Sequence, residues 1–243
     1  MKRVKVLLVG LLREWDICST GFSKWNQKHP NVQFDFYLAT WKGNDIYSKD
    51  PRLNLRGLSI HTPEEMFEVM SDSKKTYHQI VDRDTKKGDI PQIQHFYTYL
   101  IYKAKELGKS EKYDRIFLTR PDIVIDDDFL HKIANDSEED MRPNTILAAE
   151  TTVRHKKLFI GQDIGFYGLP EDINTFCNMF EDIYIKDNLY PFVMHRLQPE
   201  YMAYKGITPL RAQHQIGHIV RNYKPKDSHL FTSRHKAKKL VGV

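Results

Sequence analysis

The stretch VKVLLVG at residues 4–10 decides the fold class of this chain. An almost wholly apolar run that ends in glycine predicts a buried β-strand followed by a tight turn. Further short apolar runs predict strands over residues 34–39, 58–61, 115–118, 123–125, 145–149 and 164–167. Segments long enough for a helix separate most of these runs, which is the pattern of an α/β domain.

The clearest helix follows Pro91, and Gly108 stops it. Its apolar residues recur every three or four positions, which gives the helix one apolar face. They are Ile93, Phe96, Tyr97, Leu100, Ile101, Ala104 and Leu107. Another helix is predicted to open at Thr62-Pro63-Glu64-Glu65, where an N-cap residue precedes a first-turn proline and two acids. Two more are predicted over residues 128–135 and 170–184.

This alternation predicts one α/β domain over residues 1–220, with a mainly parallel central sheet flanked by helices. Ligands of such domains bind at the carboxyl ends of the strands. Residues 221–243 would follow as a basic C-terminal tail, in which Lys and Arg far outnumber the one acid, Asp227. A tail of this kind either contacts an anionic partner or is a solvated chain end.

The composition is that of a globular protein. Hydrophobic residues make up 40% and charged residues 28% of the 243 residues, and the formal net charge is +5. No segment approaches the roughly 18 apolar residues of a membrane-spanning helix, and residues 1–10 lack a signal-peptide cleavage site. Because the only cysteines are Cys18 and Cys177, a disulfide framework and a four-cysteine zinc site are excluded. We therefore expect a cytoplasmic protein without a transmembrane segment.

The first two predicted strands end in residues suited to a nucleotide. Gly10-Leu-Leu-Arg13 places a glycine turn and a basic side chain just past the first strand. Thr40-Trp41 follows the second strand, where tryptophan either stacks on a base or sugar or fills the core. The spaced glycines of a dinucleotide fingerprint and of a phosphate-binding P-loop are both missing from the sequence. The sequence therefore lacks the main motif that would indicate a dehydrogenase or a P-loop kinase.

The most informative stretch is YDRIFLTRPD at residues 113–122. An apolar strand delivers Arg120 and Asp122 to its carboxyl end, two residues apart and so on the same side. A carboxylate there suits a Mg²⁺ or Mn²⁺ ion that carries a diphosphate, and an arginine can bind phosphate directly. The alternative is an ion pair that closes the strand end. The three acids at residues 126–128 are predicted to cap and open the next helix.

The order of these motifs resembles the donor site of GT-A-type glycosyltransferases, in which a D-x-D motif holds a metal ion and the diphosphate of a nucleotide sugar. More narrowly, it resembles a group of predicted glycosyltransferases from large DNA viruses and bacterial surface-polysaccharide loci. Further landmarks of that resemblance are Tyr113-Asp114, the segment QDIGFYG at residues 162–168, and His195 with Pro199-Glu200. Together the motifs span roughly residues 4–210.

Two positions depart from that pattern. Arg120 stands at the first acid of D-x-D, and Leu118 stands where those relatives carry an arginine. A metal ion would therefore depend mainly on Asp122, and the need for one is left open.

The resemblance implies a GT-A-like fold and a Mn²⁺ or Mg²⁺ cofactor held by Asp122. The donor-binding residues it implies are Gly10, Leu12, Arg13, Thr40, Trp41, Arg120 and Asp122. Asp163 and Glu200 are expected to be catalytic, because a carboxylate within reach of a hydroxyl group can act as a general base. Asp163 can instead cap a turn, and Glu200 can instead be the N-terminal cap or first-turn acid of a helix predicted to open at Pro199-Glu200. His214 and His218 lie four residues apart but lack the glutamate of a metalloprotease motif.

The predicted function is transfer of a hexose or deoxyhexose from a nucleoside diphosphate sugar, with UDP favoured, to a hydroxyl group of a glycan or glycoprotein. A viral member would act in the host cytoplasm. One alternative is a sugar-phosphate nucleotidyltransferase, although the glycine-rich loop that cradles a triphosphate is missing. The other is a non-enzymatic nucleic-acid-binding module centred on residues 221–239. No nucleic-acid recognition motif supports it, so a specific nucleic-acid partner is not expected.

Overall fold

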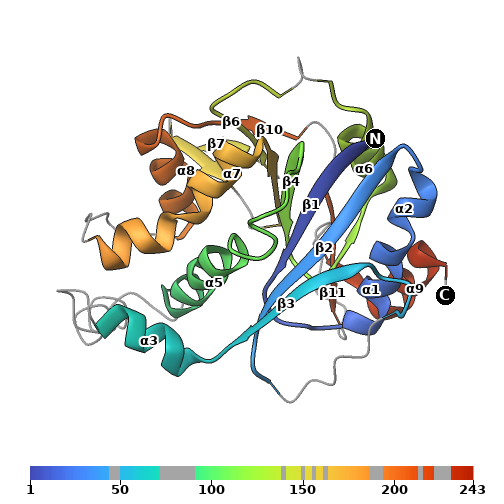
Figure 1. Cartoon of the computed structure of the whole chain (residues 1–243), viewed down its shortest axis with the longest axis horizontal. Coiled ribbons are helices and arrows are strands. Elements are labelled where there is room, and N and C mark those ends of the chain that lie inside the picture. Colours follow the sequence, from blue (N-terminus) through green and yellow to red (C-terminus); the bar gives the residue numbers. More distant parts are fainter. Residues whose placement is uncertain are drawn as a thin grey trace.

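The computed structural model describes residues 1–43, 50–71, 91–137, 141–148, 151–154, 157–160, 164–186, 194–212, 216–221 and 231–242. Its centre is a seven-stranded sheet with the order β10-β6-β9-β4-β1-β2-β3 (Figure 1). The strands are β1 (Lys2–Val9), β2 (Val32–Trp41), β3 (Leu55–His61), β4 (Arg115–Thr119), β6 (Thr145–Ala148), β9 (Gly165–Gly168) and β10 (Thr208–Arg211). All run parallel except β9, which pairs antiparallel with both β4 and β6. The predicted mainly parallel α/β sheet is confirmed.

The sheet is covered by helices on both faces (Figure 1). On one face lie α1 (Trp15–Ser23), α2 (Trp25–Lys28), α6 (Asp127–Asn135) and α9 (Arg234–Val241). On the other lie α3 (Pro63–Ser71), α5 (Pro91–Ala104), α7 (Pro170–Cys177) and α8 (Met194–Tyr204), with the π-helical turn η1 (Glu181–Ile185) after α7. Alternate residues of β1 enter the two cores: Val4, Val6 and Leu8 pack on the first face, and Leu7 and Val9 on the second. This two-sided burial explains the nearly unbroken apolar run at residues 4–9.

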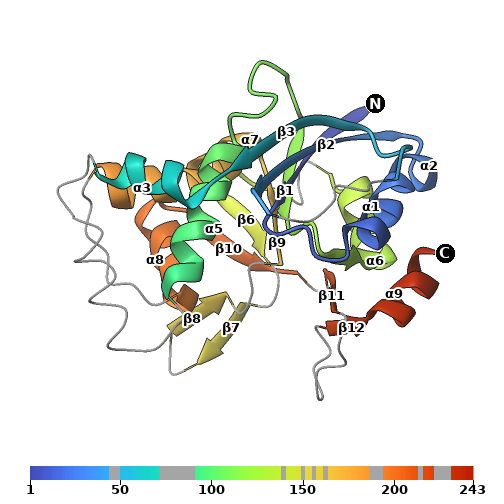
Figure 2. The same cartoon turned by 90° about the horizontal axis from the view of Figure 1, so that it is seen from below.

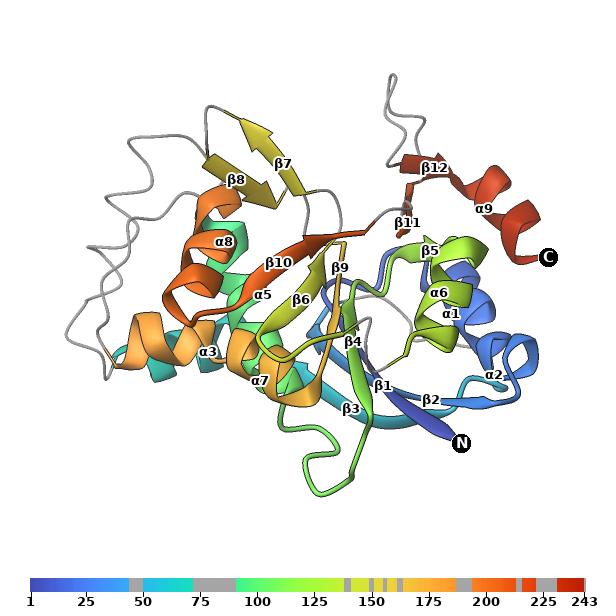
Figure 3. The same cartoon turned by 90° about the horizontal axis from the view of Figure 1, so that it is seen from above.

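Two smaller sheets complete the part of the fold that the structure describes. β5 (Ile123–Ile125), β11 (Gly217–Arg221) and β12 (Phe231–Ser233) form one with the order β12-β11-β5. β7 (Thr151–Arg154) and β8 (Lys157–Ile160) form the other, an antiparallel pair next to α8 (Figure 2 and Figure 3). The predicted strand at 123–125 is therefore not a continuation of β4. It enters a separate sheet, in which a Cβ atom added at Gly217 would lie 2.3 Å from the Val124 carbonyl oxygen, so the close pairing requires glycine.

The predicted helices are present with shifted ends. Thr62 and Glu65 form a reciprocal capping box at the start of α3, because each backbone N–H donates to the other side chain at 3.3 Å. The helix after Pro91 ends at Ala104, and Gly108, with φ +62°, follows in the next turn. The helix predicted over residues 170–184 divides into α7 and η1. None of the described helices is long and apolar enough to cross a membrane.

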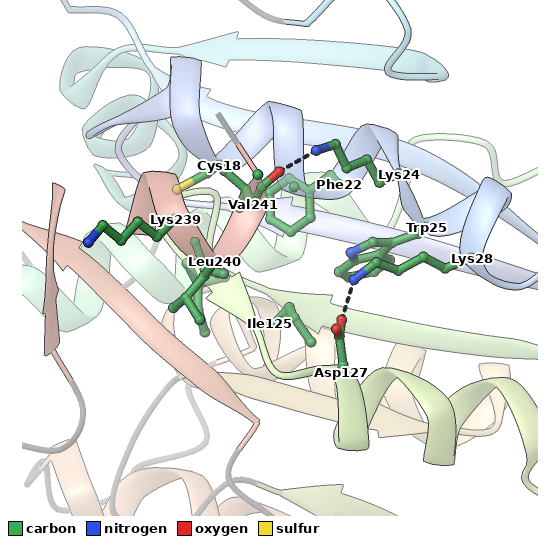
Figure 4. A pocket seen from close by; sticks show the side chains of 14 residues that line it. Cys18, Phe22, Lys24, Trp25, Lys28, Ile125, Asp127, Lys239, Leu240 and Val241 are labelled. Atoms are coloured by element: carbon green, nitrogen blue, oxygen red, sulfur yellow. Dashed lines mark hydrogen bonds and ion pairs between the residues drawn. The ribbon is translucent and has the colours of Figure 1, made fainter. Parts of the chain in front are cut away.

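The described part of the predicted tail is a strand and a helix, β12 and α9. Ala237 and Val241 of α9 are buried in the core that includes α1. The C-terminal end of α9 borders a cavity of about 210 Å³, where the Lys24 ammonium donates to the Val241 carbonyl oxygen (Figure 4). This segment therefore contributes to the core of the α/β domain.

Candidate functional site

The strand order reverses direction between β1 and β4, and we call this place the β1–β4 switch point. From β1 the chain continues to β2 and β3, which follow β1 in one direction across the sheet. It later returns to β4, which is the neighbour of β1 in the other direction. Connections that leave neighbouring strands in opposite directions open a crevice at the carboxyl ends of those strands. At this position Gly10 lies directly over Pro121, since a Cβ added at Gly10 would be 3.5 Å from Pro121 Cδ. The turn after β1 and the turn after β4 are therefore in contact.

Gly10 provides a backbone conformation that other residues rarely adopt. Its φ is +135°, and its N–H donates to the Ala39 carbonyl oxygen at 3.1 Å, which ties the turn to the end of β2. In the loop that follows, Leu12 is buried and anchors the chain, whereas Leu11 and Arg13 are exposed. Arg13 is therefore a solvent-exposed residue three positions after Gly10.

Glu14, directly after Arg13, has the left-handed φ of +52°. For a residue with a side chain this conformation costs roughly 1–2 kcal/mol. Its carboxylate is only 5% exposed and pairs with Arg234 of α9, which also binds Asp16 at 2.6 Å. The C-terminal segment thus holds the start of α1 and the end of the Gly10–Arg13 loop. Sequence reasoning missed Arg234, because no local pattern links it to a loop 220 residues earlier.

The end of β2 is mostly packed. Thr40 is buried, at 1% exposure. The Trp41 ring stacks on Tyr99 with a centroid distance of 5.7 Å and an interplanar angle of 19°, and Phe96 packs edge-on at 5.2 Å. Trp41 is partly exposed and fills the space between β2 and α5. Of the two roles considered for this side chain, core packing is therefore present, and contact with a ligand stays a prediction.

Arg120 and Asp122 form a two-pronged ion pair in the turn between β4 and β5. The Arg120 Nε donates to Asp122 Oδ1 at 2.8 Å, and one Nη donates to Oδ2 at 3.0 Å. The Asp122 side chain is 1% exposed and that of Arg120 is 21% exposed. The pair fixes the plane of the guanidinium at the switch point. Arg120 and Asp122 therefore lie together as predicted, and they form the ion pair that was the alternative to a metal site.

Both carboxylate oxygens of Asp122 accept hydrogen bonds from Arg120, which leaves this carboxylate poorly placed to ligate a metal ion as well. Among the residues that the structure describes, no group of three or more His, Cys, Asp or Glu side chains is arranged to hold a metal. The described residues alone do not fit the metal site that the D-x-D resemblance implies.

β9 brings a further segment to the same edge. Because β9 is antiparallel to β4, its first residue, Gly165, pairs with Thr119, the last residue of β4. The Thr119 hydroxyl donates to the Ile164 carbonyl oxygen at 2.5 Å. Gln162 and Asp163 precede Ile164 in the chain and lie outside the described residues, so the catalytic role of Asp163 stays a prediction.

Glu200 lies in the interior of α8. The prediction that a helix opens at Pro199-Glu200 was wrong, since α8 begins at Met194 and contains Pro199. The next two residues, Tyr201 and Met202, are buried in the core beside β10 and anchor the helix. Glu200 itself is partly exposed, and its catalytic role stays a prediction.

The predicted histidines are not gathered at this site within the described residues. His218 of β11 lies 3.4 Å from Asp126, the residue before α6. Burial raises the pKa of the Asp126 carboxyl group, and nearby His218 partly offsets that rise. His214 is not among the described residues, and of His195 only the helical backbone is described.

No protein-family model matches the sequence, and no curated protein matches it. The solved structures that are similar to this chain include three at low identity. The galactosyltransferase LgtC in complex with donor and acceptor sugar analogues is 11% identical, covering 85% of this chain and 72% of LgtC, with a TM-score of 0.43. A predicted nucleotide-diphospho-sugar transferase from Desulfovibrio desulfuricans G20 is 10% identical, covering 87% and 80%, with a TM-score of 0.40. An active-site mutant of LgtC is 12% identical, covering 85% and 72%, with a TM-score of 0.42. Scores in this range do not establish a shared activity.

Proposed function

We propose that this protein is a GT-A-like glycosyltransferase that binds a nucleoside diphosphate sugar at the β1–β4 switch point. The observation that carries the proposal is the contact between the Gly10–Arg13 loop and the Arg120–Asp122 turn at the carboxyl edge of a mainly parallel sheet. This edge is where such sheets bind ligands, and it presents arginine side chains from two different strand ends. UDP is the favoured nucleotide, on the resemblance of the motifs.

The chemistry that the described residues supply is charge neutralisation. When a glycosyl bond to a diphosphate breaks, negative charge develops on the departing phosphate oxygens. Arg13 is exposed three positions after Gly10, and Arg120 is held in a fixed plane by Asp122. Preorganised cations at these positions would stabilise that charge in the transition state. Asp163 and Glu200 are proposed to face the acceptor hydroxyl, of a glycan or glycoprotein, with one of them accepting its proton.

The donor-binding site is proposed to work through arginine rather than through a metal ion on Asp122 alone. A Mn²⁺ or Mg²⁺ ion would need at least one ligand from outside the described residues, because Arg120 engages both Asp122 oxygens. We therefore expect measurable donor binding to persist in the presence of a chelator.

Titration calorimetry with UDP, GDP and their hexose conjugates, with Mn²⁺ or with a chelator, tests the proposal. Replacing Arg13 with methionine removes one charge-assisted hydrogen bond to phosphate, worth about 1.5–3 kcal/mol, so affinity should fall roughly 10- to 100-fold. The matched control is Arg142→Met, because Arg142 is an exposed arginine just before β6, at the opposite edge of the sheet. Affinity in that variant should stay within about twofold of wild type.

Absence of binding to every nucleotide and nucleotide sugar would refute the proposal. An equal loss in the Arg13 and Arg142 variants would show that only overall charge matters. Release of pyrophosphate from a nucleoside triphosphate and a sugar phosphate would instead identify a nucleotidyltransferase.

A further inference from the structure

A second cavity lies near the amino end of the central sheet. It has a volume of about 200 Å³ and is bordered by β1, β4, α7 and the turn after α5. Pro170, Asn174 and Asn178, at intervals of four residues, line it from α7 and the residue just past its end. Lys5 of β1 lines its base, five residues before Gly10. At about 3.3 Å per residue, Lys5 and the switch point are roughly 17 Å apart along the strand. The cavity is therefore separate from the proposed donor site.

Lys5 is a nearly fully buried ammonium group, at 3% exposure. Its Nζ donates to the Lys105 carbonyl oxygen at a long 3.3 Å and lies 5.3 Å from the centre of the Tyr37 ring. Within the described residues no carboxylate lies within 4.0 Å of it. An ammonium can donate three hydrogen bonds, and a buried charge without a counter-charge is costly. Burial accordingly lowers the pKa of Lys5.

The other charged side chains that line the cavity already have partners of opposite charge, and Glu111 pairs with Arg3 and Arg56. Lys105 contacts Glu106 and Glu181 at 3.8 and 3.7 Å, and Lys109 binds Glu106 at 3.0 Å. The cavity lining contains three lysines and two glutamates, so its formal charge is 3 − 2 = +1. Lys5 is the lysine whose charge is not compensated in the described part of the chain.

A hydrogen-bond acceptor is also unsatisfied in the same cavity. The Asn174 Oδ1 is buried and has no hydrogen-bond partner within the described residues. An occupant with negative charge would compensate Lys5, and one that also offers a hydrogen-bond donor would satisfy Asn174, which lines the same cavity.

We propose that this cavity is a binding site for a protonated phosphate group, in which phosphate oxygens accept from Lys5 and a P–OH group donates to Asn174. Hydrogen phosphate carries both functions, and sulfate carries only the first. A water occupies about 30 Å³ of liquid, so a cavity of about 200 Å³ has room for an oxyanion with some of its hydration. The site would take inorganic phosphate or the phosphate of a small monoester.

Thermal unfolding with inorganic phosphate, sulfate or chloride at matched ionic strength tests this proposal. Phosphate at ten times its Kd should raise the Tm of the wild-type chain by roughly 3–6 °C, and sulfate should do less. Lys5→Met should abolish the phosphate effect. The charge-matched control is Lys238→Met, since Lys238 is an exposed lysine of α9, on the other face of the central sheet, and this variant should keep the effect.

A measurement on the wild-type chain keeps the test independent of whether the Lys5 variant folds. In ¹⁵N-resolved NMR spectra, phosphate should shift the side-chain amide signals of Asn174 and Asn178 with saturation, and adding the same concentration of chloride should not. Unshifted amide signals, or equal stabilisation of the wild-type and Lys5→Met chains, would overturn the proposal. A comparable response to phosphate and chloride would also overturn it, because it would show general screening of charge.

Discussion

Replacing Asp122 with asparagine removes one charge and nearly preserves the side-chain shape. The carboxylate is 1% exposed, and both of its oxygens accept from Arg120. In the variant, the amide NH₂ would face a guanidinium N–H, so one hydrogen bond is lost and the Arg120 guanidinium loses the negative charge of Asp122. Breaking a buried ion pair in this way costs about 3–5 kcal/mol. Because Arg120 is 21% exposed and can turn toward water, we expect a smaller loss of about 2–3 kcal/mol.

For a chain of this size, that loss corresponds to a drop in Tm of roughly 4–12 °C. The control is Asp128→Asn in the exposed first turn of α6, where the same substitution should cost less than about 1 kcal/mol. Adding Arg120→Met to Asp122→Asn should recover part of the stability, because the guanidinium charge is then removed. Calorimetric unfolding of the four variants, including Arg120→Met alone, measures this coupling. Equal Tm losses for Asp122→Asn and Asp128→Asn, or purely additive effects of Arg120→Met, would refute the reasoning.

Four further substitutions test other parts of the chain. Gly217→Ala should destabilise the chain by about 1–3 kcal/mol in denaturant unfolding, because the new Cβ would lie 2.3 Å from a backbone oxygen of β5; unchanged stability would contradict the close pairing. Arg234→Met should weaken nucleotide-sugar binding several-fold in calorimetry, because the strained Glu14 beside the loop loses its partner; unchanged affinity would show that α9 only supports the fold. Asp163→Asn and Glu200→Gln should lower turnover, by 10²-fold or more for the one that acts as a base, with Tm nearly unchanged; a large Tm loss with normal turnover per folded molecule would identify a structural role.

The strands of the central sheet could be predicted because their signal is local. Five of residues 4–9 are apolar because both faces of β1 are buried, and Lys5 is the exception. The antiparallel direction of β9 has no such local signal in the sequence, because it depends on pairing with β4 and β6. The separate sheet formed by β5 and β11 likewise depends on residues about 90 positions apart, Ile123–Ile125 and Gly217–Arg221.

The error at α8 has a similar cause. Proline is common at the first position of a helix, so Pro199 seemed to mark a helix start. In the structure, α8 begins five residues earlier, at Met194, and the burial of Tyr201 and Met202 outweighs the lost backbone hydrogen bond. The start of α8 therefore depends on tertiary packing, which cannot be predicted from the neighbouring residues in the sequence.

The candidate site could be predicted in part for a geometric reason. Residues that follow parallel strands meet at one edge, and this is how Gly10 and the Arg120–Asp122 turn come together. The sequence is compatible with either an ion pair or a metal site in that turn. The structure shows that both carboxylate oxygens of Asp122 accept hydrogen bonds from Arg120. The contact from Arg234 to Glu14 could not be found from the sequence, since a basic run near the C-terminus has the same composition whether it is solvated or packed.

The location of nucleotide-sugar binding tests the central claim most directly. Backbone amide signals should be followed by NMR while a UDP-hexose is added to the wild-type chain. Binding at the β1–β4 switch point predicts saturable shifts for Gly10, Leu11, Arg13 and Asp122, with little change at Gly108 at the opposite edge of the sheet. Shifts confined to other elements, or no shifts at donor concentrations of several millimolar (about 4 kcal/mol of binding free energy or less), would contradict it.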